Sequence, residues 1–198
     1  MLAKRCFDLF FTIPGMIVLL PIFVAISILI KFDTPGPVFF RQERVGRFGV
    51  PFRIYKFRTM IVEAEKIGKQ ITVGDDQRIT QSGRFLRKYK LDELPQLINV
   101  LMGDMSLVGP RPEVPRYVAE YPETVRRIVL SVPPGITDFA SIEYKDENTI
   151  LARAANPEAA YIHEVLPRKL EYCLQYVYQR SLWLDFVIIL RTMKTMFS

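Results

Sequence analysis

The chain has 198 residues, 49% of them hydrophobic, which suits one domain with a sizeable core and excludes a disordered, low-complexity protein. Two cysteines and one histidine exclude a disulfide scaffold and a four-cysteine zinc site, and they argue against a Ser-His-Asp triad. The net charge is +6, and residues 1–60 contain nine Lys or Arg and three Asp or Glu, so they carry the whole excess. An apolar segment separates these charges, which favours anionic lipid over nucleic acid as the partner.

The first expected element is a helix over the uncharged run Leu9–Ile30, whose 22 residues are long enough to cross a membrane. As a helix the run would measure ~33 Å, against a hydrocarbon core of ~30 Å. A signal peptide is the first alternative, but the apolar run continues past Ala25-Ile26-Ser27 without a clean cleavage site. A helix that spans the membrane once is the simplest interpretation of such a run.

Two features favour a re-entrant hairpin that enters the membrane, bends and returns. Pro14 and Pro21 interrupt the run, and a proline inside a helix removes a backbone hydrogen bond and bends the axis. The basic residues that flank the run on its two sides are Lys4, Arg5, Lys31, Arg41, Arg44 and Arg47. The positive-inside rule places such charges on the cytoplasmic side, and a single crossing satisfies the rule for only one flank. We therefore expect residues 1–32 to form a re-entrant helix-hairpin bent at Pro21, with Pro14 as a competing bend.

Two short strands are expected next, over residues 38–42 and 52–58, joined around Gly46 and Gly49. Helices are expected over residues 60–69, 84–90, 92–103 and 158–180. Asp92 can act as an N-cap, and Pro167 is expected to interrupt the last of these helices.

The apolar stretch Leu182–Leu190 is too short to span a membrane and suits either an interfacial helix or a core helix. The fold class predicted from all these elements is α+β, mostly helical with a small β element. No linker is long enough to divide the chain, so we expect a single domain of residues 1–198.

The strongest chemical signal is a pair of adjacent carboxylates, Asp92 and Glu93, which follow the cations Arg87, Lys88 and Lys90 at the expected start of a helix. A helix N-terminus and nearby cations both favour ionised carboxylates. An ionised aspartate in this place could attack phosphorus or hold Mg²⁺ against a diphosphate, while the cations balance the charge of the transferred group. The alternative is ordinary capping, with the basic residues paired to the two carboxylates.

Other candidate phosphate ligands are single cations. Arg111 lies between Pro110 and Pro112, so a stiff loop presents its guanidinium, which can grip a phosphate through two parallel hydrogen bonds. Lys56 and Arg58 lie two residues apart on the second expected strand and so share one face. Taken singly, each of these residues also fits an exposed, solvated side chain. The chain has no Walker A sequence and no G-x-G-x-x-G after a strand, which disfavours a P-loop NTPase or a Rossmann enzyme.

Four segments together carry a family resemblance. They are residues 33–46 (DTPGPVFFRQERVG), 55–60 (YKFRTM), 91–97 (LDELPQL) and 103–112 (GDMSLVGPRP). In this order they resemble the bacterial sugar transferases, the monotopic phosphoglycosyl transferases of glycoconjugate assembly. The likeness covers nearly the whole chain, the run from Leu91 to Pro112 is its most specific part, and the length matches the family's minimal catalytic unit.

The resemblance implies transfer of a phosphosugar from a UDP-sugar to undecaprenyl phosphate, with release of UMP, in the presence of Mg²⁺. The family reacts through a phosphosugar on an aspartate. By position that aspartate is Asp92, which is also the expected Mg²⁺ contact, and Glu93 is its partner. The expected substrate-binding residues are Lys56, Arg58, Arg87, Pro110, Arg111 and Pro112.

The resemblance also implies a re-entrant N-terminal helix in the bacterial inner membrane. Residues 33–198 would then form the catalytic part on the cytoplasmic face, with C-terminal helices at the interface, and membrane lipid and a second copy of the chain are the further expected partners. Leu20-Pro21 stands where the family has Ser-Pro, residues 138–144 depart from its pattern, and Cys173 replaces a common aspartate. These departures leave the donor sugar open.

Two other functions fit parts of the sequence. A non-enzymatic, membrane-anchored interaction module would need neither Mg²⁺ nor a UDP-sugar. A glycosyl transferase that moves only the sugar would release UDP instead of UMP.

Overall fold

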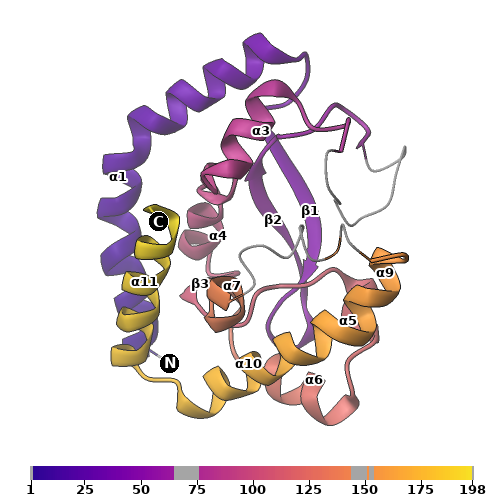
Figure 1. The fold of residues 1–198 in the computed structure, drawn as a ribbon. Coiled ribbons are helices and arrows are strands. Elements are labelled where there is room, and N and C mark those ends of the chain that lie inside the picture. Colours follow the sequence, from indigo (N-terminus) through magenta and orange to yellow (C-terminus); the bar gives the residue numbers. More distant parts are fainter. Residues whose placement is uncertain (1, 65–75, 144–150, 152–153, 198) are drawn as a thin grey trace.

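The structure is a computed structural model that describes residues 2–64, 76–143, 151 and 154–197. It is mostly helical and has two small two-stranded sheets, so the predicted α+β class is confirmed. Helix α1 (Leu2–Asp33) runs along one side of the molecule (Figure 1). The strands are β1 (Phe39–Val45), β2 (Pro51–Phe57), β3 (Ser106–Val108) and β4 (Gly135–Thr137). The other helical elements are η1 (Arg47–Gly49), α3 (Gln81–Lys88), η2 (Leu91–Glu93), α4 (Gln96–Met102), α5 (Pro115–Ala119), α6 (Glu123–Val129), α7 (Phe139–Glu143), α9 (Pro157–Ala160), η3 (Tyr161–Val165), α10 (Leu166–Gln179) and α11 (Leu182–Phe197).

The expected pair of strands is confirmed, and a second pair comes from segments far apart in the sequence. β1 and β2 form an antiparallel hairpin in which Phe40 lies opposite Lys56. β3 and β4 pair in parallel, and there the backbones of Gly109 and Gly135 touch. A Cβ on Gly135 would lie 2.1 Å from the backbone nitrogen of Gly109, so only glycine allows this approach.

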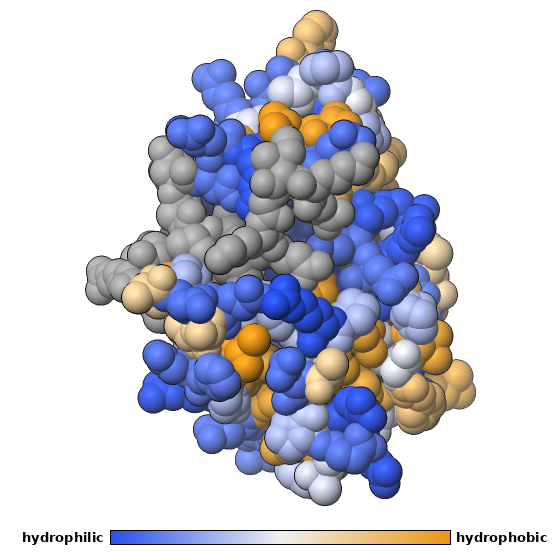
Figure 2. All heavy atoms as spheres, turned by 90° about the vertical axis from the view of Figure 1, so that its right-hand side faces the viewer, coloured by the Kyte–Doolittle hydropathy of each residue, from blue (hydrophilic) through white to orange (hydrophobic). Residues whose placement is uncertain are grey.

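Helix α1 is continuous through Pro14 and Pro21, and Figure 1 shows that it bends along its length rather than folding back on itself. It is the one helix among the described residues that is long and apolar enough to cross a membrane. Only 17% of its most apolar 18-residue window is buried, so most of this surface faces away from the protein. The face of the molecule turned away from α1 is mostly hydrophilic in its described part (Figure 2).

Polar contacts attach the first two turns of α1 to the rest of the chain. The Lys4 ammonium lies 3.1 Å from the Asp8 carboxylate and 2.9 Å from that of Asp185 on α11. Asp8 also accepts hydrogen bonds from the Ser106 hydroxyl and the Leu107 N–H, at 3.0 and 3.2 Å. The basic residues before the apolar run are therefore engaged inside the protein.

Arg5 caps a second helix from α1. Its guanidinium donates hydrogen bonds to the carbonyls of Val100 and Leu101, the latter at 2.8 Å, and these are among the last carbonyls of α4. A cation at a helix C-terminus satisfies free carbonyls and opposes the helix dipole. Gly103 follows at φ +94°, which confirms the expected end of α4.

The other end of α1 is held by the turn that follows it. Asp33 accepts hydrogen bonds from the Ser82 N–H and hydroxyl at 2.9 and 2.6 Å, in the first turn of α3. Arg58 donates to the Thr34 and Pro35 carbonyls at 2.7 and 2.5 Å. Phe23, Ile26 and Ile30 of α1 pack in one buried cluster with Phe57 and Leu86.

The C-terminal helices agree with the expectation in one respect. The α-helix expected over residues 158–180 is interrupted directly before Pro167, because the π-helix η3 separates α9 from α10, and Pro167 lies in the first turn of α10. Helix α11 packs in the core through the buried Asp185 and Ile188, while Trp183 is exposed, and its predicted interfacial position stays a prediction. Cys173 lies in a buried cluster with α5 and α6, as expected of a small apolar residue, and burial raises the pKa of its thiol. Half of the helix expected over residues 60–69 lies outside the described residues, and in the described half Met60 pairs with Ile79 in an isolated β-bridge instead of starting a helix.

The Asp33 contact generates a stability prediction. The Ser82 hydrogen bonds hold the pKa of the Asp33 carboxyl below its ordinary value. Ionised Asp33 therefore makes its full contribution to the free energy of unfolding above the pKa that its carboxyl has in the unfolded chain. This contribution is lost as the pH falls through the lower pKa of the folded state. We expect Asp33→Ala to reduce the free energy of unfolding by about 1 kcal/mol at neutral pH, and the difference to shrink at about pH 3.

Denaturant unfolding in detergent micelles at both pH values measures this difference. Glu43→Ala, which removes an exposed carboxylate from β1, is the matched control and should change little. A difference that stays constant between the two pH values would contradict the assigned contact.

Candidate active site

A short irregular passage between α3 and α4 carries the two carboxylates. Lys90 adopts a left-handed conformation, with φ +55° and ψ +19°, and Leu91–Glu93 then form the 3-10 turn η2. Helix α4 begins only after this turn, with Pro95 at its N-cap position. The prediction that Asp92 caps the helix is therefore wrong, because Asp92 lies within η2, before the N-cap residue Pro95.

Helix α4 is fixed against β2 by one buried amide. The Asn99 side chain accepts a hydrogen bond from the Tyr55 N–H and donates one to the Arg53 carbonyl, both at 2.9 Å. Asn99 is fully buried, so these bonds are shielded from water. They set α4 beside β2 and bring Glu93 within reach of Lys56, the next residue along the strand.

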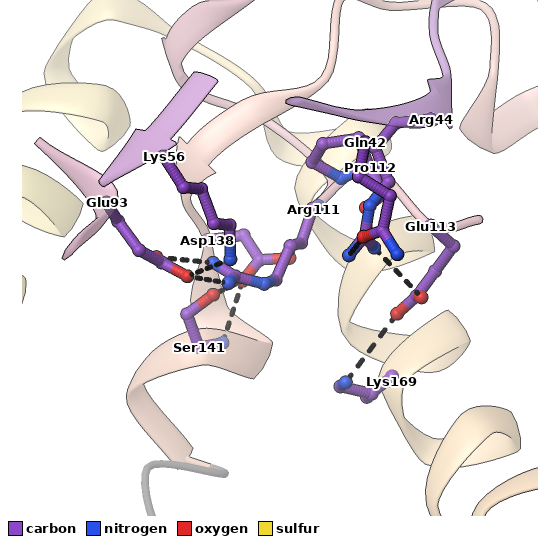
Figure 3. A network of polar contacts seen from close by, with 10 residues as sticks. All are labelled: Gln42, Arg44, Lys56, Glu93, Arg111, Pro112, Glu113, Asp138, Ser141 and Lys169. Atoms are coloured by element: carbon purple, nitrogen blue, oxygen red, sulfur yellow. Dashed lines mark hydrogen bonds and ion pairs between the residues drawn. The ribbon is translucent and has the colours of Figure 1, made fainter. Parts of the chain in front are cut away.

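Glu93 lies between two cations from distant segments (Figure 3). The Lys56 ammonium is 2.8 Å from Glu93 Oε1, and Arg111 grips both carboxylate oxygens, at 3.0 Å for the contact with Oε2. Burial would raise the pKa of Glu93, but the charges and hydrogen bonds of Arg111 and Lys56 hold it well below its ordinary value. Glu93 is therefore a carboxylate whose two oxygens are both in use.

The carboxylate of Asp92, unlike that of Glu93, is not bound by the neighbouring cations that the structure describes. Asp92 is 9% exposed, and across the described segments no hydrogen bond reaches its carboxylate. Burial, together with the charge of Glu93, raises the pKa of Asp92, while Lys56, Arg87 and Arg111 act against this rise. The site thus holds one carboxylate that is tied down and one whose oxygens are free for another partner.

Arg87 is the third cation of the predicted site. It projects from the last turn of α3, and its Nε donates a hydrogen bond to the Thr59 hydroxyl at 2.9 Å. The Arg87 guanidinium is mostly buried, which lowers its pKa, and the charge of Asp92 opposes this shift. Lys56, Arg87 and Arg111 therefore surround the two carboxylates with positive charge, as the sequence predicts.

The loop that presents Arg111 is fixed by hydrogen bonds on both sides of this residue. The Arg111 N–H donates to the Asp138 carboxylate at 3.1 Å, and the same carboxylate accepts from the Ser141 N–H and hydroxyl (Figure 3). Arg44 donates to the Pro112 carbonyl at 3.0 Å. Pro110 and Pro112 flank Arg111 as predicted, and the Gly135 N–H donates to the Pro110 carbonyl at 3.0 Å.

A second charged cluster, which the sequence analysis did not identify, lies beside this loop. Glu113 is its centre: Arg44 and Lys169 each approach the Glu113 carboxylate to 3.7 Å (Figure 3). The Tyr161 hydroxyl also donates a hydrogen bond to this carboxylate, at 2.6 Å. The charges of Lys169 and Arg44 hold the pKa of Glu113 below its ordinary value against the effect of burial. Asp138 was also missed as a site residue. The only sequence signal for Glu113 is that it follows the stiff loop Pro110–Pro112. The only signal for Asp138 is that it begins residues 138–144, which depart from the family pattern.

Arg58 does not join the site. Strand β2 ends at Phe57, so the alternation that would place Arg58 beside Lys56 no longer applies, and its guanidinium is bound to the carbonyls after α1. Arg58 therefore holds the turn after α1 and does not lie beside Lys56 as the strand alternation predicted, while its role as a substrate ligand stays a prediction. Leu20 and Pro21 lie on α1, away from the carboxylates, where Leu20 is exposed.

The described residues could hold Mg²⁺ only together with phosphate oxygens of a bound substrate. Among them there is no group of three or more His, Cys, Asp or Glu that could hold a metal ion. Lys56 and Arg111 already bind both oxygens of Glu93, whereas no hydrogen bond from the described residues reaches the Asp92 carboxylate. Mg²⁺ is commonly held by one or two carboxylates together with substrate phosphates, so a single available aspartate is compatible with such a site.

Comparison with known proteins places the whole chain in one group. The sequence model described as "Bacterial sugar transferase" matches residues 1–198. The chain is 36% identical to the UDP-N-acetylgalactosamine-undecaprenyl-phosphate N-acetylgalactosaminephosphotransferase of Aeromonas hydrophila, over 98% of this chain and 44% of the relative. It is also 36% identical to the UDP-glucose:undecaprenyl-phosphate glucose-1-phosphate transferase of Escherichia coli, over 96% and 39%. It is 39% identical to the galactosyl transferase CpsE of Streptococcus agalactiae, over 98% and 42%, so it spans well under half the length of these relatives.

The Glu93 contacts generate the next prediction. Replacing Glu93 by glutamine would leave the buried charges of Lys56 and Arg111 without their anion. We expect Glu93→Gln to lower the free energy of unfolding by about 2–3 kcal/mol, in the lower range for breaking a buried pair because the site is partly open. Denaturant unfolding in micelles measures the change.

Glu123→Gln is the matched control. It also removes a carboxylate paired to two arginines, Arg126 and Arg127, but on an exposed helix face, where screening by water makes such pairs weak. Equal stability losses in the two variants would show that the Glu93 contacts are no stronger than a surface pair.

Proposed function

The chain belongs to the bacterial sugar transferase family, and on this premise we propose that it transfers a sugar 1-phosphate from a UDP-sugar to undecaprenyl phosphate and releases UMP. One observation carries the proposal. A buried aspartate with free carboxylate oxygens, Asp92, lies among Lys56, Arg87 and Arg111. That arrangement suits a nucleophile for a doubly charged phosphate substrate, because the cations offset the charge that otherwise repels the carboxylate.

In the first half of the proposed reaction, a carboxylate oxygen of Asp92 attacks the phosphorus that carries the sugar. The bond between this phosphorus and the bridging oxygen breaks, and the bridging oxygen leaves with UMP. Hydrogen bonds to Glu93 hold Arg111 and Lys56 in place. The two cations can therefore stabilise the negative charge that develops on the phosphate oxygens without having to reorganise. The product of this half-reaction is a phosphosugar on Asp92.

In the second half, a phosphate oxygen of undecaprenyl phosphate attacks the same phosphorus. The bond to Asp92 breaks, which restores the carboxylate and gives undecaprenyl-diphosphate-sugar. No net proton change is required at Asp92 over the full cycle. A covalent intermediate allows a water-soluble donor and a lipid acceptor to use one position in turn.

Mg²⁺ belongs to the proposal as a cofactor. Asp92 would hold it together with the donor's diphosphate, and the metal would supply charge neutralisation and orientation of the phosphates. Glu93 would contribute less to the metal site, because Lys56 and Arg111 already bind its two oxygens.

The attachment of both ends of α1 supports a re-entrant position in the cytoplasmic membrane. Lys4, Arg5 and Asp8 at the first end and Asp33 at the other all contact the same body of the protein. A helix that crossed the bilayer would place these two ends on opposite sides. The exposed apolar side chains of α1 would instead enter one leaflet, leaving the active site at the cytoplasmic surface.

The donor sugar is not part of the proposal. The relatives' names specify N-acetylgalactosamine, glucose and galactose at 36–39% identity, so similarity alone does not choose among these sugars. The non-enzymatic module of the sequence analysis would release no nucleotide, and a transferase that moves only the sugar would release UDP. The nucleotide product therefore distinguishes the three functions.

Asp92→Asn tests the proposed nucleophile. We expect UMP release from a panel of UDP-sugars to fall by at least about 10³-fold, because an amide is a poor nucleophile, while the variant stays folded. Mass spectrometry of the wild-type protein incubated with donor alone should find the added mass on Asp92. Glu120→Gln, an exposed carboxylate, is the control and should keep full activity. An adduct on another side chain, or full activity of Asp92→Asn, would refute the mechanism.

Cysteine labelling tests the position of α1. With Cys6 and Cys173 replaced, single cysteines at Leu2 and Val50, which are 80% and 62% exposed, should both react with an impermeant maleimide only from the cytoplasmic side. Val45 is a less suitable reporter because it is partly buried. Labelling of the two positions from opposite sides would show a spanning helix.

A further inference from the structure

Helix α3 has three functional faces although it is only eight residues long. Leu86 is fully buried against the second half of α1, in the cluster with Ile26 and Ile30. Arg87 reaches toward Asp92 on another side. The third face carries two aromatic side chains that the proposed chemistry does not use, Phe85 and Tyr89.

These two rings form an exposed ridge. Phe85 is 50% exposed and Tyr89 45% exposed, and their ring centres lie 5.0 Å apart. The Lys88 ammonium sits 5.5 Å from the centre of the Tyr89 ring, and Lys90 is exposed directly after it. The ridge therefore combines apolar surface with positive charge, which suits a ligand with an apolar chain and an anionic head.

At one end, α3 lies against α1 through Leu86, the residue that follows Phe85. α3 packs on the part of α1 that contains Phe23, Ile26 and Ile30, and the neighbouring Leu29 and Phe32 are 43% and 87% exposed. A lipid chain that lies along the second half of α1 would therefore run toward α3, the helix that carries the aromatic rings.

At its other end the ridge leads to the nucleophile. Tyr89 is the C-cap residue of α3, Lys90 makes the left-handed turn, and Asp92 follows two residues later. A left-handed lysine is uncommon, and it lets the backbone change direction between the ridge and η2. The donor-binding cations Lys56 and Arg111 come from β2 and from the loop after β3, so donor and acceptor would approach the aspartate from different elements.

From this arrangement we infer that the Phe85–Tyr89 ridge is the binding site for the acceptor. The two rings contact the first isoprene units of the polyprenyl phosphate, and Lys88 and Lys90 attract its phosphate toward the phosphosugar on Asp92. The inference rests on the proposed function and adds to it the place where the acceptor binds. It commits to the single-chain lipid phosphate as the occupant, because only an anionic, apolar substrate uses both the rings and their route to Asp92.

The test separates the two half-reactions. In nanodiscs with the full chain, Phe85→Ala and Tyr89→Ala should raise the KM for undecaprenyl phosphate by about tenfold, the scale of losing part of an aromatic contact. UMP release in the absence of acceptor, measured in a single turnover, should stay at the wild-type rate. Lys88→Gln should raise the same KM, by a smaller factor that disappears at high salt.

Trp183→Ala is the matched control. Trp183 is a 73% exposed aromatic residue on α11, which begins at the opposite end of the molecule from α3 in Figure 1. Its loss should not change the acceptor KM. A vesicle-flotation assay, with vesicles of phosphatidylethanolamine and phosphatidylglycerol, reports general membrane binding for all four variants.

Three results would overturn the inference: an unchanged acceptor KM, an equal slowing of both half-reactions, or a KM defect that follows the loss of vesicle binding and vanishes in micelles. The last result would show that the ridge only adheres to the bilayer. Failure of the proposed function looks different, because the wild-type protein would then release no UMP from any donor.

Discussion

The position of Glu93 between Lys56 and Arg111 is the interaction on which the site depends. These three residues come from η2, from β2 and from the loop after β3, and no short stretch of sequence could place them together. Two cations buried beside one another would repel, and Glu93 removes this repulsion while fixing both side chains. Asp92, next in the chain, is then left with unengaged oxygens inside a positively charged site. Two adjacent carboxylates thus differ because of their surroundings: Glu93 is held by two cations, and no hydrogen bond from the described residues reaches the carboxylate of Asp92.

The second organising feature is the attachment of α1 at both ends. Arg5 caps α4 and Asp33 binds the start of α3, so α1 contacts the helices on either side of η2, the turn that carries Asp92. The stretch from α3 to α4 lies alongside α1 in Figure 1. Movement of α1 against this stretch would displace Asp92 relative to Lys56 on β2, which links the position of α1 to the geometry of the candidate site.

The local sequence pattern predicted the helices and strands better than it predicted the contacts between them. The hairpin of β1 and β2, the end of α4 at Gly103 and the apolar helix all follow from periodicity and turn residues, and the resemblance identified Lys56, Arg87 and Arg111. Arg58 was misplaced because alternation holds only while a strand lasts, and this one ends at Phe57. The contacts of Asp138 with the Arg111 loop and of Glu113 with Lys169 join segments far apart in the chain, and a single sequence carries no periodic signal for such pairs.

The ion pair between Lys4 and Asp185 has a consequence for biogenesis. The two partners are about 180 residues apart, so α1 is synthesised long before the part of α11 that holds its first turn. Contacts between such distant segments form slowly, so Lys4 and Asp8 stay without Asp185 until synthesis of the chain is nearly complete. Nascent chains stalled before α11 would therefore contain α1 without this contact.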